Sequence, residues 1–439
     1  MDVCVYPAKR LEGVIDPPGS KNYTTRYLLV AALTDGESFI HGPAMSEDSE
    51  ALQRCLRDLG AVLTPEPDGL RVRGFGRHPR AAGVLNPGNA GAVLRFLMAV
   101  AAATLPETTF VTEYADSLGK RPQDDLLEAL QQLGARTTSR GGRLPISIFG
   151  GDLFGGTVRV SGAISSQYTS ALLFAAPLIG RDVTRGVTRG VTIEVTGELK
   201  SRPPIRQTLQ VLREAGITVE ATPDLTRFHI PGGQAYAPRT YTVPGDYPGA
   251  AAIMAAAAVV DSDVTIRRLF EDEQGERAAV DVLTAMGADI VRDGQSVRIR
   301  GGRPLTGGRF DGDPFTDAIL ALVATSGIAI GQSIYYNIEN LRYKECDRIS
   351  DYRHELVKLG ARVEEGPAEL IIDGQPNGLD GGVTVDSHID HRVIMGLTIS
   401  ALASREPVVI RDAHHVAKSY PAFFDHLRSL GARIEVVEP

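Results

Sequence analysis

The sequence predicts an α/β fold of two domains, built from six copies of one repeat with three copies in each domain. Two observations lead to this prediction: a glycine-centred tripeptide ends six amphipathic helix patterns, and a second, more apolar helix pattern recurs at the same interval. Strand patterns flank these helices, so each copy is expected to be a βαβ-type unit with an extra hairpin. Units of this size form compact domains and not a solenoid. Six of them in 439 residues indicate two domains.

The tripeptides mark the ends of six outer helices. Their glycines stand 71 to 82 residues apart, and the tripeptides are Leu59-Gly60-Ala61, Leu133-Gly134-Ala135, Ala215-Gly216-Ile217, Met286-Gly287-Ala288, Leu359-Gly360-Ala361 and Leu430-Gly431-Ala432. A glycine just beyond a helix can adopt a positive φ and cap it, after which the chain turns into a strand. In the pattern at 124–133 the leucines share one face, which must pack on a sheet.

The second helix of each copy is rich in Ala, Leu and Ile almost all round, which is typical of a buried helix. These inner helices are expected to begin near Lys21, Asn89, Ser166, Asp246, Thr316 and Asp390. Their apolar runs, such as 250–260, are well short of the ~20 residues that span a bilayer. We therefore expect buried helices and no membrane-spanning segment.

Composition excludes several classes of function. A net charge of −8 argues against a general nucleic-acid or anionic-membrane surface, which needs a basic face. The N-terminal residues show no signal-peptide pattern, so a cytoplasmic location is expected. Cys4, Cys55 and Cys346 are too scattered for a disulfide framework or structural zinc, and they are interpreted as packing residues.

Polar residues gather at the starts of the inner helices, where unpaired N–H groups and a partial positive charge favour anions. The chain has neither GxGxxG nor GxxxxGK[ST], so nucleotide binding of those kinds is not indicated. Three such starts carry Lys21 with Arg26, the sequence 88–91 followed by Arg95, and the donor-rich 165–167. Each segment alone could also be a solvated surface or an ordinary helix cap.

The segment 340–348 is the most polar of these candidates. It places carboxylates among cations, as general acid–base chemistry requires, and Asp317 and Asp390-His391-Arg392 add to it. Cations occupy motif positions at Lys21, Arg26, Arg95, Arg121, Arg342, Lys344, Arg348, Arg392 and Lys418. Their convergence would form an anion trap that holds two mutually repelling acidic substrates in register, in a cleft between the two halves.

These motifs resemble, over essentially the whole chain, the enolpyruvyl transferases. The matching motifs are PGSK with Arg26, GNAG with Arg95, KRP at 120–122, SSQ at 165–167, LRYKECDR at 341–348, DHR at 390–392 and AKSYP at 417–421. The resemblance implies three βαβαββ units in each domain, with 1–19 plus 242–439 as one domain and 20–241 as the other. It also implies closure over phosphoenolpyruvate and shikimate 3-phosphate, an addition–elimination mechanism, and no metal or organic cofactor.

The resemblance further implies roles for individual residues. It assigns the phosphoenolpyruvate side to Lys21, Gly91, Arg121, Gln167, Arg348, Arg392 and Lys418, and the acceptor side to Asn22, Arg26, Ser165, Ser166, Ser201, Asp317, Asn340 and Lys344. Asp317 and Glu345 are the expected proton-transfer pair, with Lys21 assisting. The domain 1–19 plus 242–439 is expected to carry the phosphoenolpyruvate and carboxylate side, and 20–241 the acceptor phosphate.

Departures from the family pattern cluster on the acceptor side, at Asn22, Ala92, Phe96, Pro204 and Cys346. A different phosphorylated or acidic acceptor and a non-catalytic paralogue therefore stay open as alternatives. The expected partners are small-molecule substrates, and neither a nucleic acid nor a membrane is expected to bind. The protein is expected to be a monomer. The tandem RGVT at 185–192 is predicted to lie in a hairpin, and nothing in the sequence indicates a function for it.

Overall fold

The computed structural model describes residues 1–182 and 187–437. The chain divides into two compact units, which are Met1–Pro18 with Pro244–Pro439 (unit 1) and Gly19–Val243 (unit 2). The polypeptide therefore leaves unit 1 after its second strand, builds the whole of unit 2, and returns. Each unit has its own hydrophobic core.

Six outer helices end as the tripeptides predict. They are α2 (Glu47–Asp58), α4 (Asp124–Gln132) and α6 (Pro203–Glu214) in unit 2, and α8 (Ala278–Ala285), α10 (Ser350–Lys358) and α12 (Phe423–Ser429) in unit 1. All six glycines have φ between +83° and +107°. In each case the N–H of the next residue donates to the carbonyl five positions back, for example Ala61 to Leu56 at 2.9 Å. This is the Schellman arrangement, which satisfies carbonyls at the helix end.

Six inner helices alternate with the outer ones along the chain. They are α1 (Lys21–Ala32), α3 (Gly91–Thr104) and α5 (Ser166–Ala175) in unit 2, and α7 (Tyr247–Ala258), α9 (Ile319–Ser326) and α11 (His391–Leu402) in unit 1. The expectation of buried helices is confirmed, since α7 is buried along its whole length. The predicted start of α9 near Thr316 was three residues early, because a short 3-10 helix at Asp313–Phe315, containing Pro314, precedes it.

Unit 2 contains three four-stranded sheets. Their orders are β16 (Thr240–Thr242)–β3 (Glu37–His41)–β5 (Gly69–Arg73)–β4 (Val62–Glu66), then β6 (Val84–Leu85)–β7 (Thr108–Phe110)–β9 (Ile146–Phe149)–β8 (Arg136–Thr138), and β10 (Gly156–Ser161)–β13 (Val191–Thr196)–β15 (Arg227–Ile230)–β14 (Glu220–Ala221).

Unit 1 contains three further sheets of the same kind. Their orders are β2 (Arg10–Ile15)–β17 (Asp261–Ile266)–β19 (Ser296–Arg300)–β18 (Asp289–Asp293), then β20 (Arg309–Asp311)–β21 (Gln332–Tyr336)–β23 (Glu369–Asp373)–β22 (Arg362–Gly366), and β24 (Thr384–Val385)–β25 (Val408–Ile410)–β1 (Asp2–Val5)–β26 (Ile434–Val437).

Every four-stranded sheet joins one parallel pair to an antiparallel hairpin. In the second sheet of unit 2, for example, β6 and β7 are parallel across α3, and β9 pairs antiparallel with both β7 and β8 after α4. The order βαβαββ is therefore confirmed as the repeat. Strands distant in sequence complete some copies, since β16 pairs with β3 and β1 lies between β25 and β26.

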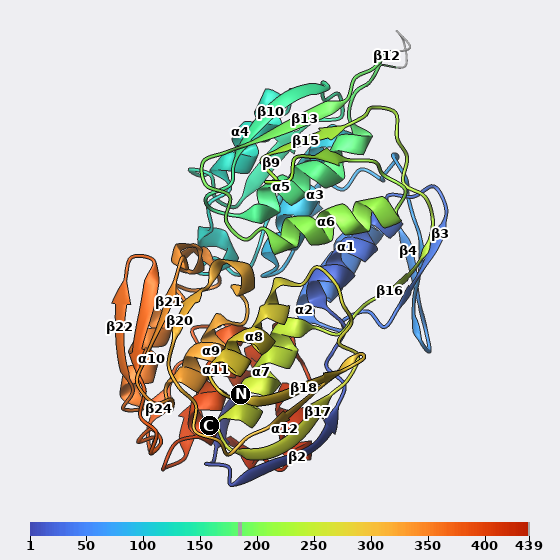
Figure 1. Cartoon of the computed structure of the whole chain (residues 1–439). Helices are drawn as coiled ribbons and strands as arrows, with labels where there is room; N and C mark the ends of the chain where they lie inside the picture. The colour runs from blue at the N-terminus through green and yellow to red at the C-terminus, as the bar shows by residue number, and fades with distance from the viewer. Residues whose placement is uncertain (183–186, 438–439) are drawn as a thin grey trace. The chain divides into compact units, whose positions relative to one another are not determined.

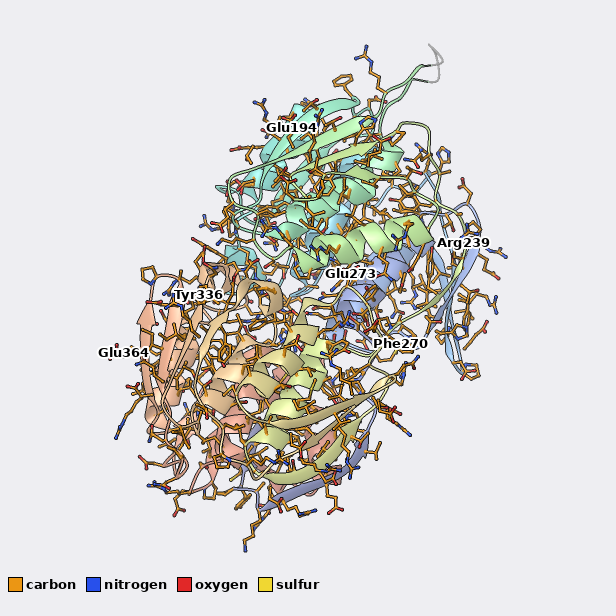
Figure 2. The ribbon with its side chains drawn as sticks, in the orientation of Figure 1. Glu194, Arg239, Phe270, Glu273, Tyr336 and Glu364 are labelled. Carbon is orange, nitrogen blue, oxygen red and sulfur yellow. The ribbon has the colours of Figure 1, made fainter. Side chains whose placement is uncertain are left out.

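Helices form the centre of each unit, and in unit 2 the outer helix α6 takes part together with the inner ones. In unit 1, α7, α9 and α11 pack pairwise against one another, and in unit 2 α3 packs on α5 and α6 packs on both α5 and α1 (Figure 1). Many charged side chains lie on the outer faces of the sheets, as Glu194 does where it accepts from Arg159 at 3.2 Å (Figure 2). The inner helices are thus held within the packed core of each unit.

The predicted hairpin around the RGVT tandem lies only partly within the described residues. Arg181–Asp182 (β11) and Val187–Thr188 (β12) pair antiparallel, whereas Arg185 and Gly186 lie outside the described residues. Among the helices of the described part of the chain, none has the length and apolar character needed to cross a bilayer.

Candidate active site

Arg348 is the centre of a buried ion-pair cluster in unit 1. Its side chain is 1% exposed and donates from Nε to Asp390 Oδ2 at 2.8 Å, from Nη1 to Asp317 Oδ1 at 3.1 Å, and from Nη2 to Glu345 Oε2 at 2.9 Å. Burial alone would lower the pKa of Arg348, but the three carboxylates raise it well above its ordinary value. Arg348 therefore stays charged and fixes the positions of all three acids.

Local structure explains how these groups meet. Asp390 is the N-cap of α11, and its Oδ1 accepts from the backbone N–H of Arg392 at 2.7 Å. Glu345 follows the 3-10 helix Glu339–Tyr343 and stands three residues before Arg348. The backbone N–H of Arg348 donates to Leu341 O at 3.2 Å, which closes the loop.

Lys418 extends the cluster from the end of the 3-10 helix Ala413–Lys418. Its ammonium donates to Glu345 Oε1 at 2.6 Å, and its side chain is 3% exposed. Glu345 thus has one oxygen on Lys418 and the other on Arg348. With Arg392, three cations face three carboxylates, and this balance reduces the cost of burying the charges.

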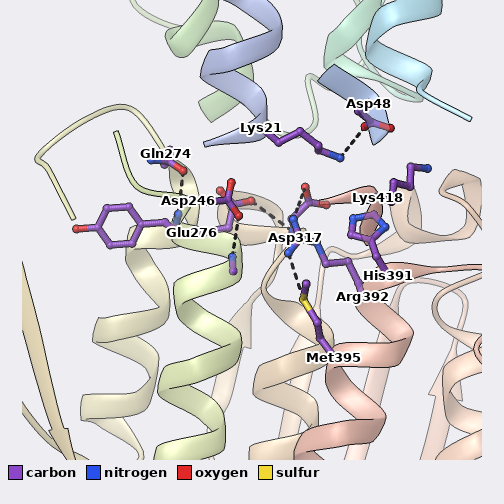
Figure 3. A network of polar contacts seen from close by, with 12 residues as sticks. Lys21, Asp48, Asp246, Gln274, Glu276, Asp317, His391, Arg392, Met395 and Lys418 are labelled. Carbon is purple, nitrogen blue, oxygen red and sulfur yellow. Dashed lines mark hydrogen bonds and ion pairs between the residues drawn. The ribbon is translucent and has the colours of Figure 1, made fainter. Parts of the chain in front are cut away.

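Arg392 and Glu276 surround Asp317 on its other side (Figure 3). Arg392 Nη2 lies 3.8 Å from Asp317 Oδ2, and the backbone N–H of Asp317 donates to Glu276 Oε1 at 3.4 Å. Burial, together with the negative charge of Asp317, raises the pKa of Glu276 to about 8. At neutral pH Glu276 is therefore mostly a neutral acid beside the ion-pair cluster.

The remaining predicted residues of unit 1 lie on the same loop as Glu345. Asn340 is buried within the 3-10 helix, and Lys344 is half-buried beside Glu345. Arg342 has another role, because it donates to Pro367 O at 3.0 Å and to Gly366 O at 2.7 Å. The structure therefore makes Arg342 an anchor to the β22–β23 hairpin, and it does not join the cluster around Arg348.

A second polar cluster lies at the starts of α3 and α5 in unit 2. Arg95 donates from Nε to Gln123 Oε1 at 3.0 Å and from Nη1 to Gln167 Oε1 at 2.7 Å, with Ser165 Oγ at 3.4 Å. Gly91 opens α3 directly beside these groups. A Cβ at Gly91 would lie 2.9 Å from Arg121 Nη1 and 3.6 Å from Gln167 Oε1. Only glycine leaves the Arg121 side chain in this position.

Ser165 also confirms the simpler interpretation of its segment. It is the N-cap of α5, and its Oγ accepts from the backbone N–H of Gln167 at 3.3 Å. Ser166 is buried as the first residue of the helix, and Ser201 is buried two residues before α6, with φ of 52°.

Lys21 and Arg26 lie on α1, as the PGSK motif predicts. Lys21 Nζ forms an ion pair with Asp48 Oδ2 at 3.0 Å. Arg26 donates to Thr208 Oγ1, to the carbonyl of Asn22 and to the carbonyl of Pro204, so that it braces α1 against α6. Burial lowers the pKa of Arg26 to about 10, which leaves it charged at neutral pH.

Sequence reasoning missed three residues of these clusters. Glu276 lies in an acidic stretch, 271–276, that is typical of a solvated loop, so no local signal marks it as buried. Asp48 is in the first turn of α2, where acidic residues are ordinary. Gln123 is the N-cap residue of α4, a position that does not by itself indicate a functional site. Only their spatial partners reveal them.

Comparison with known proteins assigns the family. Residues 5–427 match the family model described as EPSP synthase (3-phosphoshikimate 1-carboxyvinyltransferase). A 3-phosphoshikimate 1-carboxyvinyltransferase of Deinococcus radiodurans is 53% identical, covering 100% of this chain and 97% of that protein. The one from Burkholderia pseudomallei is 40% identical, covering 97% and 93%.

Solved structures agree with the sequence matches. An EPSP synthase structure from Acinetobacter baumannii covers 100% of both chains with a TM-score of 0.81 and 25% sequence identity. The chain therefore belongs to the EPSP synthase family, the 3-phosphoshikimate 1-carboxyvinyltransferases.

Proposed function

We propose that Asp317 and Glu345 carry out the proton transfers of this enzyme, with Lys21 assisting. As a member of its family, the chain is a transferase that moves the enolpyruvyl group of phosphoenolpyruvate to the 5-hydroxyl of shikimate 3-phosphate and releases phosphate. The alternatives of another acceptor or a non-catalytic paralogue gain no support from the matches.

The reaction needs an acid and a base in turn. A proton is added to the methylene carbon of phosphoenolpyruvate, the acceptor hydroxyl attacks the adjacent carbon and loses its proton, and the resulting tetrahedral adduct then loses a methyl proton and phosphate. Carboxylates that change protonation state can serve both steps. Fixed cations lower the energy of the departing phosphate.

The placement of Glu345 between Lys418 and Arg348 is the observation that carries this proposal. Both of its oxygens are held by cations, at 2.6 and 2.9 Å. An anionic substrate that engages Lys418 and Arg348 competes for the two cations that pair with Glu345, and weaker pairing favours the protonated form that an acid requires. Substrate binding would in this way prepare the acid for the addition step.

In our proposal the predicted contact residues divide between the two substrates. Arg348, Arg392 and Lys418 of unit 1, with Lys21, Arg121, Gln167 and Gly91 of unit 2, would contact phosphoenolpyruvate. Asn22, Arg26, Ser165, Ser166 and Ser201 of unit 2, with Asp317, Asn340 and Lys344 of unit 1, would contact the acceptor. Unit 1 would thus supply the catalytic carboxylates and unit 2 most of the acceptor phosphate site. We also propose that the active species is a monomer, which sedimentation at assay concentration would test.

Glu345→Gln tests the acid–base assignment. The amide keeps the size of the side chain but cannot transfer a proton, so we expect kcat for phosphate release to fall by ~10²–10⁴-fold. The melting temperature is measured in parallel to verify folding. Glu364→Gln, the same change at an exposed position on β22 (Figure 2), is the matched control and should keep full activity. Turnover of Glu345→Gln within threefold of the parent would refute the assignment.

A further inference from the structure

The turn that leads into α11 has an unusual backbone. His388 and Ile389 are consecutive non-glycine residues with φ of 49° and 55°. The left-handed region is costly for residues with a Cβ, and above all for a β-branched one such as Ile389. The turn connects β24 with Asp390, the N-cap that binds Arg348. A strained backbone persists only where surrounding contacts hold it.

Glu355 provides those contacts from α10. Its side chain is 1% exposed, and Oε2 accepts from the backbone N–H of Asp386 at 2.9 Å. Oε1 lies 3.1 Å from Nε2 of His388. Lys358 Nζ lies 2.8 Å from both oxygens and partly balances the charge. A buried carboxylate thus grips the turn by its backbone and by the ring of His388.

Hydrogen bonds within the turn connect the residues that Glu355 contacts with Asp390 in the ion-pair cluster. Asp386 Oδ1 accepts from the backbone N–H of His388 at 2.7 Å, and Ser387 Oγ accepts from that of Ile389 at 3.3 Å. The carbonyl of Ser387 accepts from the N–H of Asp390 at 3.0 Å. The direction of the Asp390 side chain therefore depends on the turn that Glu355 holds.

We infer that Glu355 is a positioning residue for the phosphoenolpyruvate side of the reaction. It holds the strained turn 386–389 so that Asp390 orients the guanidinium of Arg348 and caps the helix that carries Arg392. Glu355 itself is not among the residues proposed to contact phosphoenolpyruvate or the acceptor. The inference rests on the proposed function, in which Arg348 and Arg392 contact phosphoenolpyruvate.

Replacing Glu355 by Gln tests this role. The amide keeps the shape of the side chain but loses the negative charge that holds the backbone N–H of Asp386 and the ring Nε2 of His388. We expect the KM for phosphoenolpyruvate to rise at least fivefold, while the KM for shikimate 3-phosphate stays within twofold. A residue that only stabilised the fold would lower the melting temperature and leave both constants unchanged below it. If Glu355→Gln does not fold, Glu355→Asp, which shortens the grip by one methylene, gives the same comparison.

A second substitution restores the turn by another route. Ile389 is 40% exposed, so Ile389→Gly loses little packing and removes the Cβ that makes the positive φ costly. We expect Ile389→Gly, added to Glu355→Gln, to bring the KM for phosphoenolpyruvate back to within twofold of the parent. Ile389→Ala loses nearly the same contacts and the β-branch but keeps the Cβ, so it should lower this KM less than Ile389→Gly does.

The outcomes separate this inference from the proposed function. If Arg348→Lys leaves the KM for phosphoenolpyruvate unchanged, the assignment of Arg348 to that substrate is wrong. If Arg348→Lys raises this KM and Glu355→Gln does not, only the role of Glu355 is wrong. A raised KM in Glu355→Gln that Ile389→Gly fails to lower would also overturn the inference.

Discussion

Gly91→Ala should weaken phosphoenolpyruvate binding without weakening the fold. The added Cβ would lie 2.9 Å from Arg121 Nη1, whereas the next contacts, to Arg95 Nη1 and Gln167 Oε1, are ordinary at 3.6 Å. The guanidinium of Arg121 must therefore move by roughly 0.5 Å to reach normal van der Waals separation. A flexible side-chain end can do this at small cost, so the effect falls on the position of the cation.

The size of the effect follows from what Arg121 is proposed to bind. A hydrogen bond to a charged group contributes about 1.5–3 kcal/mol, and a displaced donor loses part of this. A loss of ~1–2 kcal/mol corresponds to a rise of roughly 5- to 30-fold in the KM for phosphoenolpyruvate. Alanine at the first turn of α3 is a better helix former than glycine, so the free energy of unfolding should stay level or rise by up to ~1 kcal/mol.

Steady-state phosphate release with each substrate varied in turn measures this prediction, together with the midpoint of urea unfolding. Gly83→Ala is the matched control, because a Cβ at Gly83 would meet nothing within 4 Å. It should change neither KM. A KM for phosphoenolpyruvate in Gly91→Ala within twofold of the parent would show that Arg121 does not contact this substrate through the displaced group. An equal rise in both KM values would mean that the whole cluster, and not one cation, had shifted.

Three further predictions concern stability. Burial, with the negative charge of Asp317, raises the pKa of Glu276 to about 8. The stability that the neutral carboxyl contributes is therefore full below the unfolded-state pKa of about 4.3, and it is lost as pH rises through 8. Thermal melts of Glu276→Gln should therefore show a gain of ~3–6 °C over the parent at pH 8.5 and a smaller gain at pH 5.5; equal gains would contradict the buried acid. Gly60→Ala, at φ of +103°, should lose ~1–2 kcal/mol in urea unfolding with unchanged kcat. Arg342→Ala should lose ~1–3 kcal/mol while kcat/KM stays within about threefold; a large kinetic loss would return Arg342 to the active site.

Much of the architecture could be predicted from the sequence because it depends on local rules. A glycine after an amphipathic helix has one common use, and all six predicted caps have positive φ. Helices apolar all round, such as α7, can only be buried. The start of α9 was predicted three residues too early. A short 3-10 helix containing Pro314 precedes α9, and the pattern of apolar residues does not indicate it.

Only part of the candidate site could be predicted from the sequence. The motifs marked Arg348, Glu345 and Lys418 individually, but sequence spacing says nothing about which oxygen faces which cation. Arg342 has the same charge and lies on the same loop as Lys344, yet it contacts the β22–β23 hairpin. The difference lies in the direction of a side chain, which the packing of the loop decides.

By itself, the sequence determined the repeat, the two kinds of helix and the residue types available for the chemistry, because propensity and periodicity act over a few neighbouring residues. Only the tertiary structure decided which charges are buried together. Glu276 became a neutral acid because the fold buries it and places Asp317, 41 positions away, against it. Glu355 became a support for Asp390 because α10 packs beside the start of α11. Coulomb interactions and desolvation depend on distance in space and not on distance along the chain.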